Sequence, residues 1–134
     1  MALGDVRKLD VHTDQRGWLA EILKQEHVQA GKPFGQFYVT TAHPGVVKAN
    51  HFHSRKTEWF CVIRGNALLV LSDKSGQQRE EIPIGEGNMV VVRIPPGVAH
   101  GIKNVGSDMM YLLAYIDEPY NPADPDTTAA KVVE

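Results

Sequence analysis

The sequence has little of what marks several protein classes: it contains one cysteine, no basic cluster and no apolar run longer than a strand. The single cysteine, Cys61, excludes an internal disulfide. The 14 basic and 16 acidic residues are mixed along the chain and give a net charge of -2, so we expect no nucleic-acid or membrane partner. The first residues carry no export signal. Together these absences favour a cytoplasmic location.

The chain is rich in short apolar segments bounded by Gly, Pro, Asn and Asp, a pattern typical of strands in a sandwich or barrel. Its 134 residues are 43% hydrophobic and 22% charged, so we expect one domain over residues 1–134. Helix is limited to one turn within 25–30, hairpin turns are expected at 64–66 and 73–76, and 118–134 reads as a loop-like tail. The expected strands are 6–11, 18–24, 36–41, 46–53, 58–64, 67–72, 89–94, 99–104 and 109–116.

Two of these strands are apolar on both faces. In 58–64, the face that begins with Glu58 should point inward, which leaves Trp59 and Cys61 on an outer face that is also apolar. The strand 109–116 shows the same pattern. An apolar outer face on a small barrel needs a cover, so we expect a homodimer. The alternative is that the N-terminal strands cover this face within one chain.

The middle of the chain contains residues of the types that bind metals, at strand spacing. His51 and His53 are two positions apart, so their side chains share one face of a strand. A short turn separates them from Glu58, which can return on the next strand and bring a carboxylate to the two imidazoles. His100 follows the Pro-Pro-Gly turn at 95–97 and is a fourth candidate. Imidazole and carboxylate ligands suit Zn, Fe, Mn, Ni or Cu.

This spacing resembles the two motifs of the cupin superfamily. The first motif is matched by Gly45, His51, His53, Glu58 and Gly65, and the end of the second by Pro95, Gly97, His100 and Asn104. The resemblance implies an all-β, single-domain cupin, that is, a double-stranded β-helix or jelly-roll barrel. It also implies that one divalent metal ion, zinc first and iron, manganese or nickel as alternatives, binds to His51, His53, Glu58 and His100. The other interpretation is a metal-free cupin that uses His51 as a base.

The order of the remaining segments is similar to that of nucleotide-sugar cupins of surface-polysaccharide synthesis, which include 3,5-epimerases and 3,4-ketoisomerases. The segments that carry this resemblance are 14–21, 34–38 and 120–127. The chain looks most similar to the C-terminal cupin domain of capsular polysaccharide reductases. It lacks the Arg-Gly pair usual in the 3,5-epimerases, but it keeps Glu58 and His100, which the ketoisomerases usually lack. The resemblance therefore favours a metal-dependent epimerase or isomerase of a nucleotide-linked keto-sugar.

The reaction implied is proton abstraction next to a sugar ketone, with the resulting enolate stabilised by a cation. His51 matches the base of the metal-free epimerases, but its lone pair cannot serve as base and ligand together. With metal bound, we expect Tyr120 or a water molecule to carry the proton, with Lys48 as a helper.

Four residues are candidate substrate contacts, and each has a structural alternative. Arg16 contacts a phosphate or belongs to an ordinary turn before a strand. Gln36 and Tyr38 alternate on a strand, so they line the cup or pack at the edge of the core. Arg55, like Lys48, lies in the pocket or is a surface charge.

Three functions stay open at this point, because one fold serves many activities. The first is the keto-sugar epimerase or isomerase, toward which the sequence leans, and which would make the protein an enzyme with a small-molecule substrate. The second is an iron-dependent dioxygenase that acts on a small organic molecule with the same ligands. The third is a non-catalytic cupin that binds a sugar or an organic acid.

Overall fold

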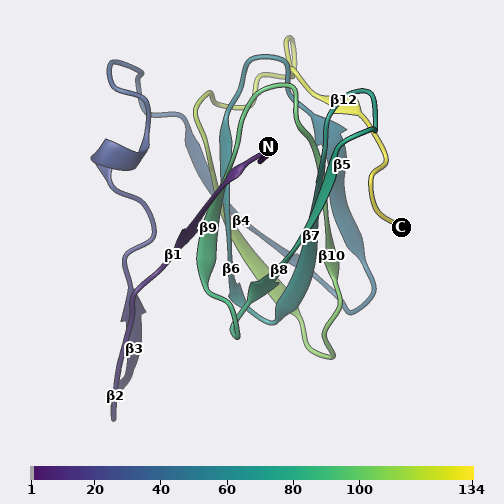
Figure 1. Cartoon of the computed structure of the whole chain (residues 1–134). Helices are drawn as coiled ribbons and strands as arrows, with labels where there is room; N and C mark the ends of the chain where they lie inside the picture. The colour runs from purple at the N-terminus through teal and green to yellow at the C-terminus, as the bar shows by residue number, and fades with distance from the viewer. Residues whose placement is uncertain (1) are drawn as a thin grey trace.

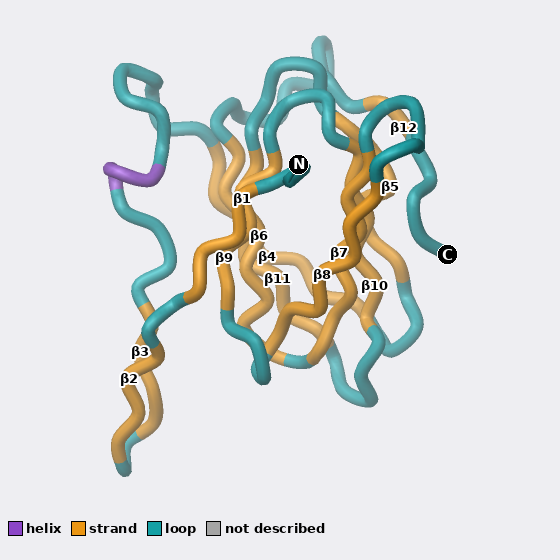
Figure 2. The backbone as a smooth tube through the Cα atoms, in the orientation of Figure 1, coloured by secondary structure: helices purple, strands orange, loops and turns teal. Residues whose placement is uncertain are grey.

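Residues 2–134 are described by a computed structural model, in which two five-stranded antiparallel sheets face each other and enclose a barrel (Figures 1 and 2). The first sheet contains, in spatial order, β1 (Asp5–Lys8), β9 (Val90–Ile94), β6 (Glu58–Arg64), β11 (Met110–Ile116) and β4 (Gln36–Ala42). The second contains β12 (Thr128–Ala129), β5 (Val47–Phe52), β10 (Ala99–Asn104), β7 (Asn66–Ser72) and β8 (Arg79–Gly85). The all-β jelly-roll barrel expected from the sequence is confirmed.

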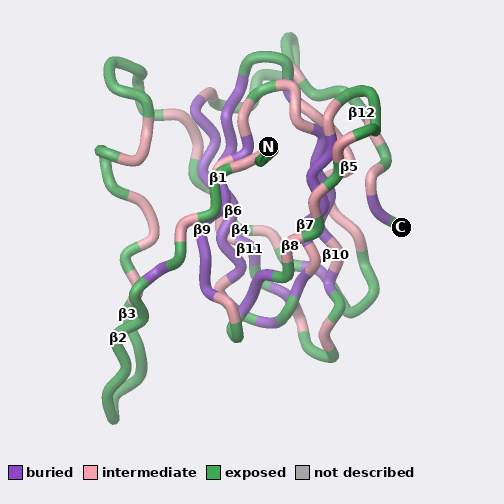
Figure 3. Tube along the Cα trace, in the orientation of Figure 1, coloured by how far each residue is buried: buried purple, intermediate pink, exposed green. Residues whose placement is uncertain are grey.

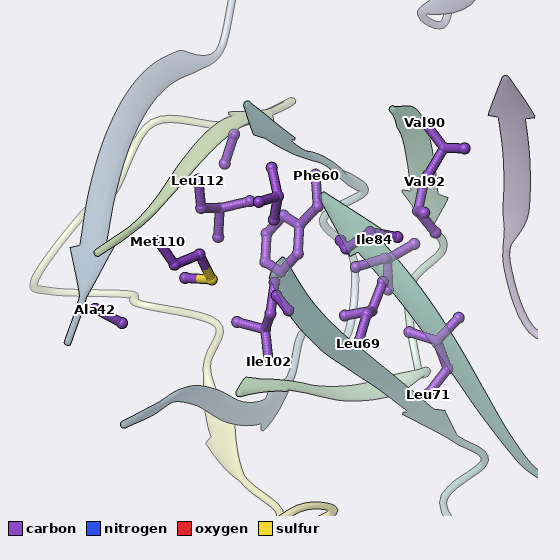
Figure 4. Packing of buried hydrophobic residues seen from close by; sticks show 14 residues of the cluster. Ala42, Phe60, Leu69, Leu71, Ile84, Val90, Val92, Ile102, Met110 and Leu112 are labelled. Atoms are coloured by element: carbon purple, nitrogen blue, oxygen red, sulfur yellow. The ribbon is translucent and has the colours of Figure 1, made fainter. Parts of the chain in front are cut away.

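The hydrophobic core fills the space between the two sheets. Figure 4 shows Phe60 and Leu112 from the first sheet facing Leu69 and Ile102 from the second, and all four side chains are almost completely buried. Burying each such side chain contributes about 1.5–3 kcal/mol to folding. Strand register fixes where the core stops: β6 begins where β11 ends, at the pair Glu58 and Ile116. This end of the barrel carries the buried polar residues His53, Glu58 and His100.

The N-terminal segment covers the outer face of β6. Trp59 and Cys61 are 5% and 1% exposed and pack against Leu9, Leu23 and other side chains of the first 28 residues. The apolar outer faces of two strands were the reason to expect a homodimer, and for β6 the alternative, cover within one chain, is the arrangement found. A partner is therefore not needed to bury the outer face of β6.

A hairpin of β2 (Val11–Asp14) and β3 (Gly17–Ala20) projects away from the barrel (Figure 1) and is exposed along its length (Figure 3). The expected strands 6–11 and 18–24 are therefore too long at one end. Leu9, which follows β1, is buried against Trp59 and Cys61 on the outer face of β6. Beyond Leu9 the chain leaves the barrel sheet. The single helical turn predicted within 25–30 is the 3-10 helix η1 (Gln25–His27).

Two other expectations about local structure were wrong. Residues 64–66 do not form a hairpin, because β6 and β7 belong to opposite sheets and Gly65, with φ of 87°, carries the chain between them. Strand β8 was missed because Pro83 interrupts its pattern, and the proline is tolerated because β8 lies at the edge of its sheet. The tail 118–134 is mostly loop, but its short strand β12 pairs with β5. No helix among residues 2–134 is long and apolar enough to cross a membrane.

Candidate metal centre

Four side chains meet at the end of the barrel where β6 begins. His51 lies near the end of β5, His53 directly follows that strand, Glu58 opens β6 and His100 is the second residue of β10. One ligand atom from each of these residues lies within 4.8 Å of every other. His53, Glu58 and His100 are buried and His51 is half-buried. The structure thus brings together the four ligands that the cupin resemblance implies.

A bulge in β5 sets the direction of His51. Ala49 and Asn50 have φ of 70° and 57°, and the pairing of β5 with β10 shifts at this point, so that His51 lies opposite His100. A Cβ on Gly101, the neighbour of His100, would lie 2.3 Å from Asn50 Oδ1, so a larger residue there would displace the Asn50 side chain. The sequence spacing predicted that His51 and His53 share a face, but it gave no sign of the bulge.

The Pro-Pro-Gly turn connects two ligands through the main chain. Gly97 has φ of 83°, and the amide of Val98 donates to the Pro95 carbonyl at 3.4 Å, as in a turn with proline and glycine at its centre. The Gly97 amide donates to the His53 carbonyl at 2.7 Å. The turn that opens the strand of His100 therefore also fixes the backbone of His53.

Backbone carbonyls determine the tautomers of two histidines. His53 Nδ1 lies 2.8 Å from the Asp126 carbonyl oxygen, and His100 Nδ1 lies 3.0 Å from that of Val98. A carbonyl only accepts, so in both rings Nδ1 donates its hydrogen and Nε2 faces the centre. The Nε2 atoms of His53 and His100 lie 3.1 and 3.3 Å from the same oxygen, Glu58 Oε1.

This arrangement gathers more acceptors than donors at one buried point. His100 Nε2 is buried and has no hydrogen-bond partner in residues 2–134, because its approach to Glu58 is outside hydrogen-bond geometry. Two imidazole lone pairs that face a carboxylate repel it unless a proton or a cation lies between them. Three nitrogens and one carboxylate form a ligand set for a borderline divalent cation, and the carbonyl partners at Nδ1 are those found behind metal-bound histidines. The residues therefore fit a divalent metal ion.

The environment also sets the protonation of these groups. Burial, together with the neighbouring His100 and His53, lowers the pKa of His51 to about 4, so its ring is neutral at pH 7. Burial acts to lower the pKa of His53, but its hydrogen bonds to Glu58 and to the Asp126 carbonyl outweigh burial and raise it. Burial acts to raise the pKa of Glu58, but the two nearby histidines outweigh burial and lower it. Glu58 is therefore an anion at neutral pH.

Tyr38 holds the carboxylate from the other side. Its hydroxyl donates to Glu58 Oε2, which directs Oε1 toward the histidines. Burial and the charge of Glu58 raise the pKa of Tyr38, so the phenol keeps its hydrogen and remains a donor. The structure therefore gives Tyr38 a contact with a candidate ligand, although sequence reasoning considered it a substrate contact.

A cavity of about 350 Å³ opens beside the four-residue cluster. Of the residues singled out in the sequence, Gln36, Tyr38 and Tyr120 line it together with His51, His53 and Glu58. Sequence reasoning missed four lining residues: Lys56, Ile116, Glu118 and Thr127. Lys56 is only 3% exposed, and its position between His53 and Glu58 in the first motif was the signal that could have identified it.

Three other predicted site residues do not line this cavity. Arg16 lies at the tip of the β2–β3 hairpin and pairs with Asp14 at 2.5 Å. Lys48 Nζ donates to Thr40 Oγ1 at 3.1 Å. Arg55 pairs with Glu118 and Asp124, at 2.9 Å each. In a single chain, these three side chains are engaged elsewhere, and their roles toward substrate stay predictions.

A jelly-roll barrel with three histidines and a glutamate at one end is the arrangement expected of the cupin class. Within that class, the chain belongs to the family described as the polysaccharide biosynthesis C-terminal domain, whose model matches residues 12–128. The match confirms the family resemblance recognised in the sequence.

Individual relatives agree with this assignment. A probable low-salt glycan biosynthesis epimerase, Agl13 of Haloferax volcanii, is 32% identical over 132 residues, which are 91% of this chain and 82% of the relative. A UDP-2-acetamido-2,6-beta-L-arabino-hexul-4-ose reductase of Pseudomonas aeruginosa is 36% identical over 124 residues, covering 92% of this chain but only 32% of the reductase. The chain thus spans about a third of that enzyme. A dTDP sugar isomerase structure from Desulfovibrio desulfuricans superposes with a TM-score of 0.82 over 95% of this chain and 83% of its own, at 24% identity, which supports the fold.

Proposed function

We propose that this protein is a cation-dependent cupin that epimerises or isomerises a nucleotide-linked keto-sugar in the synthesis of a surface polysaccharide. The observation that carries the proposal is the convergence of His51, His53, Glu58 and His100 on one point beside a cavity. The names of the relatives, a probable glycan epimerase and a reductase of a UDP-linked hexulose, support the substrate class. They also support the leaning toward an enzyme.

The four ligands supply no proton carrier of their own once their lone pairs are engaged. A divalent cation held by them would act as a Lewis acid toward a substrate carbonyl and so acidify the neighbouring C–H. The proton must then move to and from a residue of the cavity wall. Glu58 is held by Tyr38 and by the histidines, so its carboxylate is not free for this task.

Tyr120 is the best candidate for the proton carrier. It lines the cavity and is 63% exposed, so its hydroxyl can exchange a proton with substrate or water. Its main-chain amide donates to Gln36 Oε1 at 2.7 Å, which ties its loop to β4. Lys56 adds a positive charge at the cavity wall, where its Nζ donates to the Pro125 carbonyl at 3.2 Å. A lysine at this position suits contact with the diphosphate of a nucleotide sugar.

The test combines metal analysis with proton exchange. Purified protein is loaded with Zn²⁺, Fe²⁺, Mn²⁺ or Ni²⁺ in turn and mixed with UDP- and dTDP-linked 4-keto-sugars in deuterated water. We expect one metal ion per chain and deuterium at the carbon next to the carbonyl, observed by NMR. Oxygen uptake with the iron form and no deuterium incorporation would instead favour the dioxygenase. Metal-loaded protein that binds these sugars without exchange would favour the binding module.

The homodimer is part of the proposal. The β2–β3 hairpin projects from the barrel (Figure 1). Its Val11, Trp18 and Leu19 are exposed, and so are Phe37 and Val39 on the outer face of β4. Two separate apolar surfaces on one small chain can each be covered by a second copy around a two-fold axis. The N-terminal segment already covers the outer face of β6. The support for a dimer therefore comes from the exposed apolar residues of the β2–β3 hairpin and of β4.

A further inference from the structure

The C-terminal segment reaches back to His53 at Asp126 and at the next residue, Thr127, whose Oγ1 lies 3.4 Å from His53 Nδ1. The main-chain oxygen of Asp126 accepts from His53 Nδ1 at 2.8 Å, and its carboxylate accepts from the amides of Ser54 at 2.8 Å and Arg55 at 3.0 Å. Asp126 therefore holds both the ring of His53 and the turn that follows it. That turn leads from His53 to Glu58, the next ligand along the chain.

We propose that Asp126 is a positioning residue of the metal centre: it fixes His53 as the Nδ1–H tautomer and aims Nε2 at the cation. The proposal rests on the proposed metal site and adds a residue outside the ligand set. It assigns two tasks to Asp126. The carboxylate holds the peptide units of Ser54 and Arg55, and this in turn places the carbonyl at the His53 ring.

The backbone of Asp126 supports this assignment. Its φ is 46°, in the left-handed region that costs most residues about 1 kcal/mol or more, with aspartate, asparagine and glycine tolerated best. The carboxylate, which caps two amides, keeps the residue in this conformation. In the left-handed conformation the Asp126 carbonyl points at His53 Nδ1, whereas an extended residue would turn it elsewhere.

The neighbouring acidic residue of the same segment provides a matched control. Among the described residues, the Asp124 carboxylate binds the guanidinium of Arg55, at 2.9 Å, and neither His53 nor the amides of the turn. A general loosening of the tail would follow from loss of either carboxylate. A positioning role predicts that only Asp126 affects the ring of His53.

The experiment measures two properties of the full chain. The first is the protonated nitrogen of His53 in metal-free protein, read from long-range ¹⁵N–¹H NMR. The second is Zn²⁺ affinity, measured by competition with a chromophoric chelator. Both are determined for the wild type and for Asp126→Gly, Asp126→Asn and Asp124→Asn.

We expect His53 Nδ1 to carry a hydrogen throughout in the wild type and in Asp124→Asn, and only part of the time in Asp126→Gly. Zn²⁺ affinity should fall about 10- to 100-fold in Asp126→Gly, as for loss of other partners behind metal ligands, and much less in Asp126→Asn, which keeps an acceptor and the left-handed conformation. Asp124→Asn should match the wild type.

Two results would overturn the proposal: a His53 ring in metal-free wild type that carries no hydrogen on Nδ1, or equal Zn²⁺ affinity in folded Asp126→Gly and wild type. The first requires no variant, so it holds even if Asp126→Gly fails to fold. If the wild type binds no metal, the metal-dependent function fails on its own, and the tautomer measurement still decides whether Asp126 orients His53.

Discussion

His100 Nε2 lies 3.3 Å from Glu58 Oε1 in the barrel interior, yet the two atoms form no hydrogen bond. A buried imidazole nitrogen that faces a carboxylate in this way is stable when a cation joins them. If the proposed cation binds, this relationship makes His100 the fourth ligand, although it lies 42 positions after Glu58 in the sequence.

Replacing His100 by alanine should therefore remove metal binding. We expect the Zn²⁺ affinity of His100→Ala to fall by more than about 100-fold, since loss of a ligand exceeds the effect of losing a partner behind one. Chelator competition measures the affinity, and circular dichroism checks the fold. His43→Ala, which removes an exposed histidine, is the control. Retention of wild-type affinity by His100→Ala would remove this residue from the site.

Tyr120 should be needed for proton transfer and dispensable for metal binding. In Tyr120→Phe we expect deuterium exchange into the keto-sugar to fall by at least about 100-fold, the lower range for loss of a general acid–base group. Metal content should stay at one ion per chain. Tyr111→Phe, which removes an exposed hydroxyl from the outer face of β11, should leave both unchanged. Unaltered exchange in Tyr120→Phe would assign the proton to another carrier.

The low pKa of His51 predicts an acid-sensitive window in chelator-treated protein. Burial lowers this pKa from 6.5 to about 4, so the unfolded chain binds a proton in this interval and the folded chain does not. The stabilisation is complete above pH 6.5 and is lost as the pH falls toward 4. The melting temperature of His51→Asn should thus change less between pH 6.5 and 4 than that of the wild type or of His43→Asn. Parallel curves for all three proteins would contradict the expected shift.

Cys61 should be inert while the protein is folded. Its thiol is 1% exposed, and burial raises its pKa to about 11, so almost no thiolate exists at pH 8. We expect reaction with a thiol-specific chromogenic disulfide only after denaturant is added. Rapid labelling of native protein would mean that the N-terminal cover of β6 opens readily.

The β2–β3 hairpin should control association. We expect the wild type to sediment as a dimer at micromolar concentration and the double variant Trp18→Ser, Leu19→Ser to sediment as a monomer, because exposed tryptophans often dominate interfaces. Val105→Ser changes an exposed apolar residue elsewhere and should remain a dimer. A monomeric wild type would end the dimer proposal.

Much of the candidate metal centre could be predicted because two local signals agree: the spacing of the candidate ligands and the bounds of the strands that carry them. The alternation of His51 and His53 and the return to Glu58 need only strand geometry, and β6 and β10 begin and end at the expected residues. The remaining features depend on distant contacts. Pro83 hid β8 because nothing local shows that a strand lies at an edge. The role of Asp126 depends on a left-handed backbone and on a turn far away in the chain.

The hydrogen bond between His53 and the Asp126 carbonyl spans 73 residues and therefore sets an order of events during synthesis. Strands β5 and β6 leave the ribosome well before the segment that orients His53. Before residue 126 emerges, the nascent chain contains His51 and His53, but the His53 ring has no Asp126 carbonyl to orient it. Binding of the proposed metal ion in its final geometry would then wait until residues 126 and 127 have emerged and folded back over the barrel.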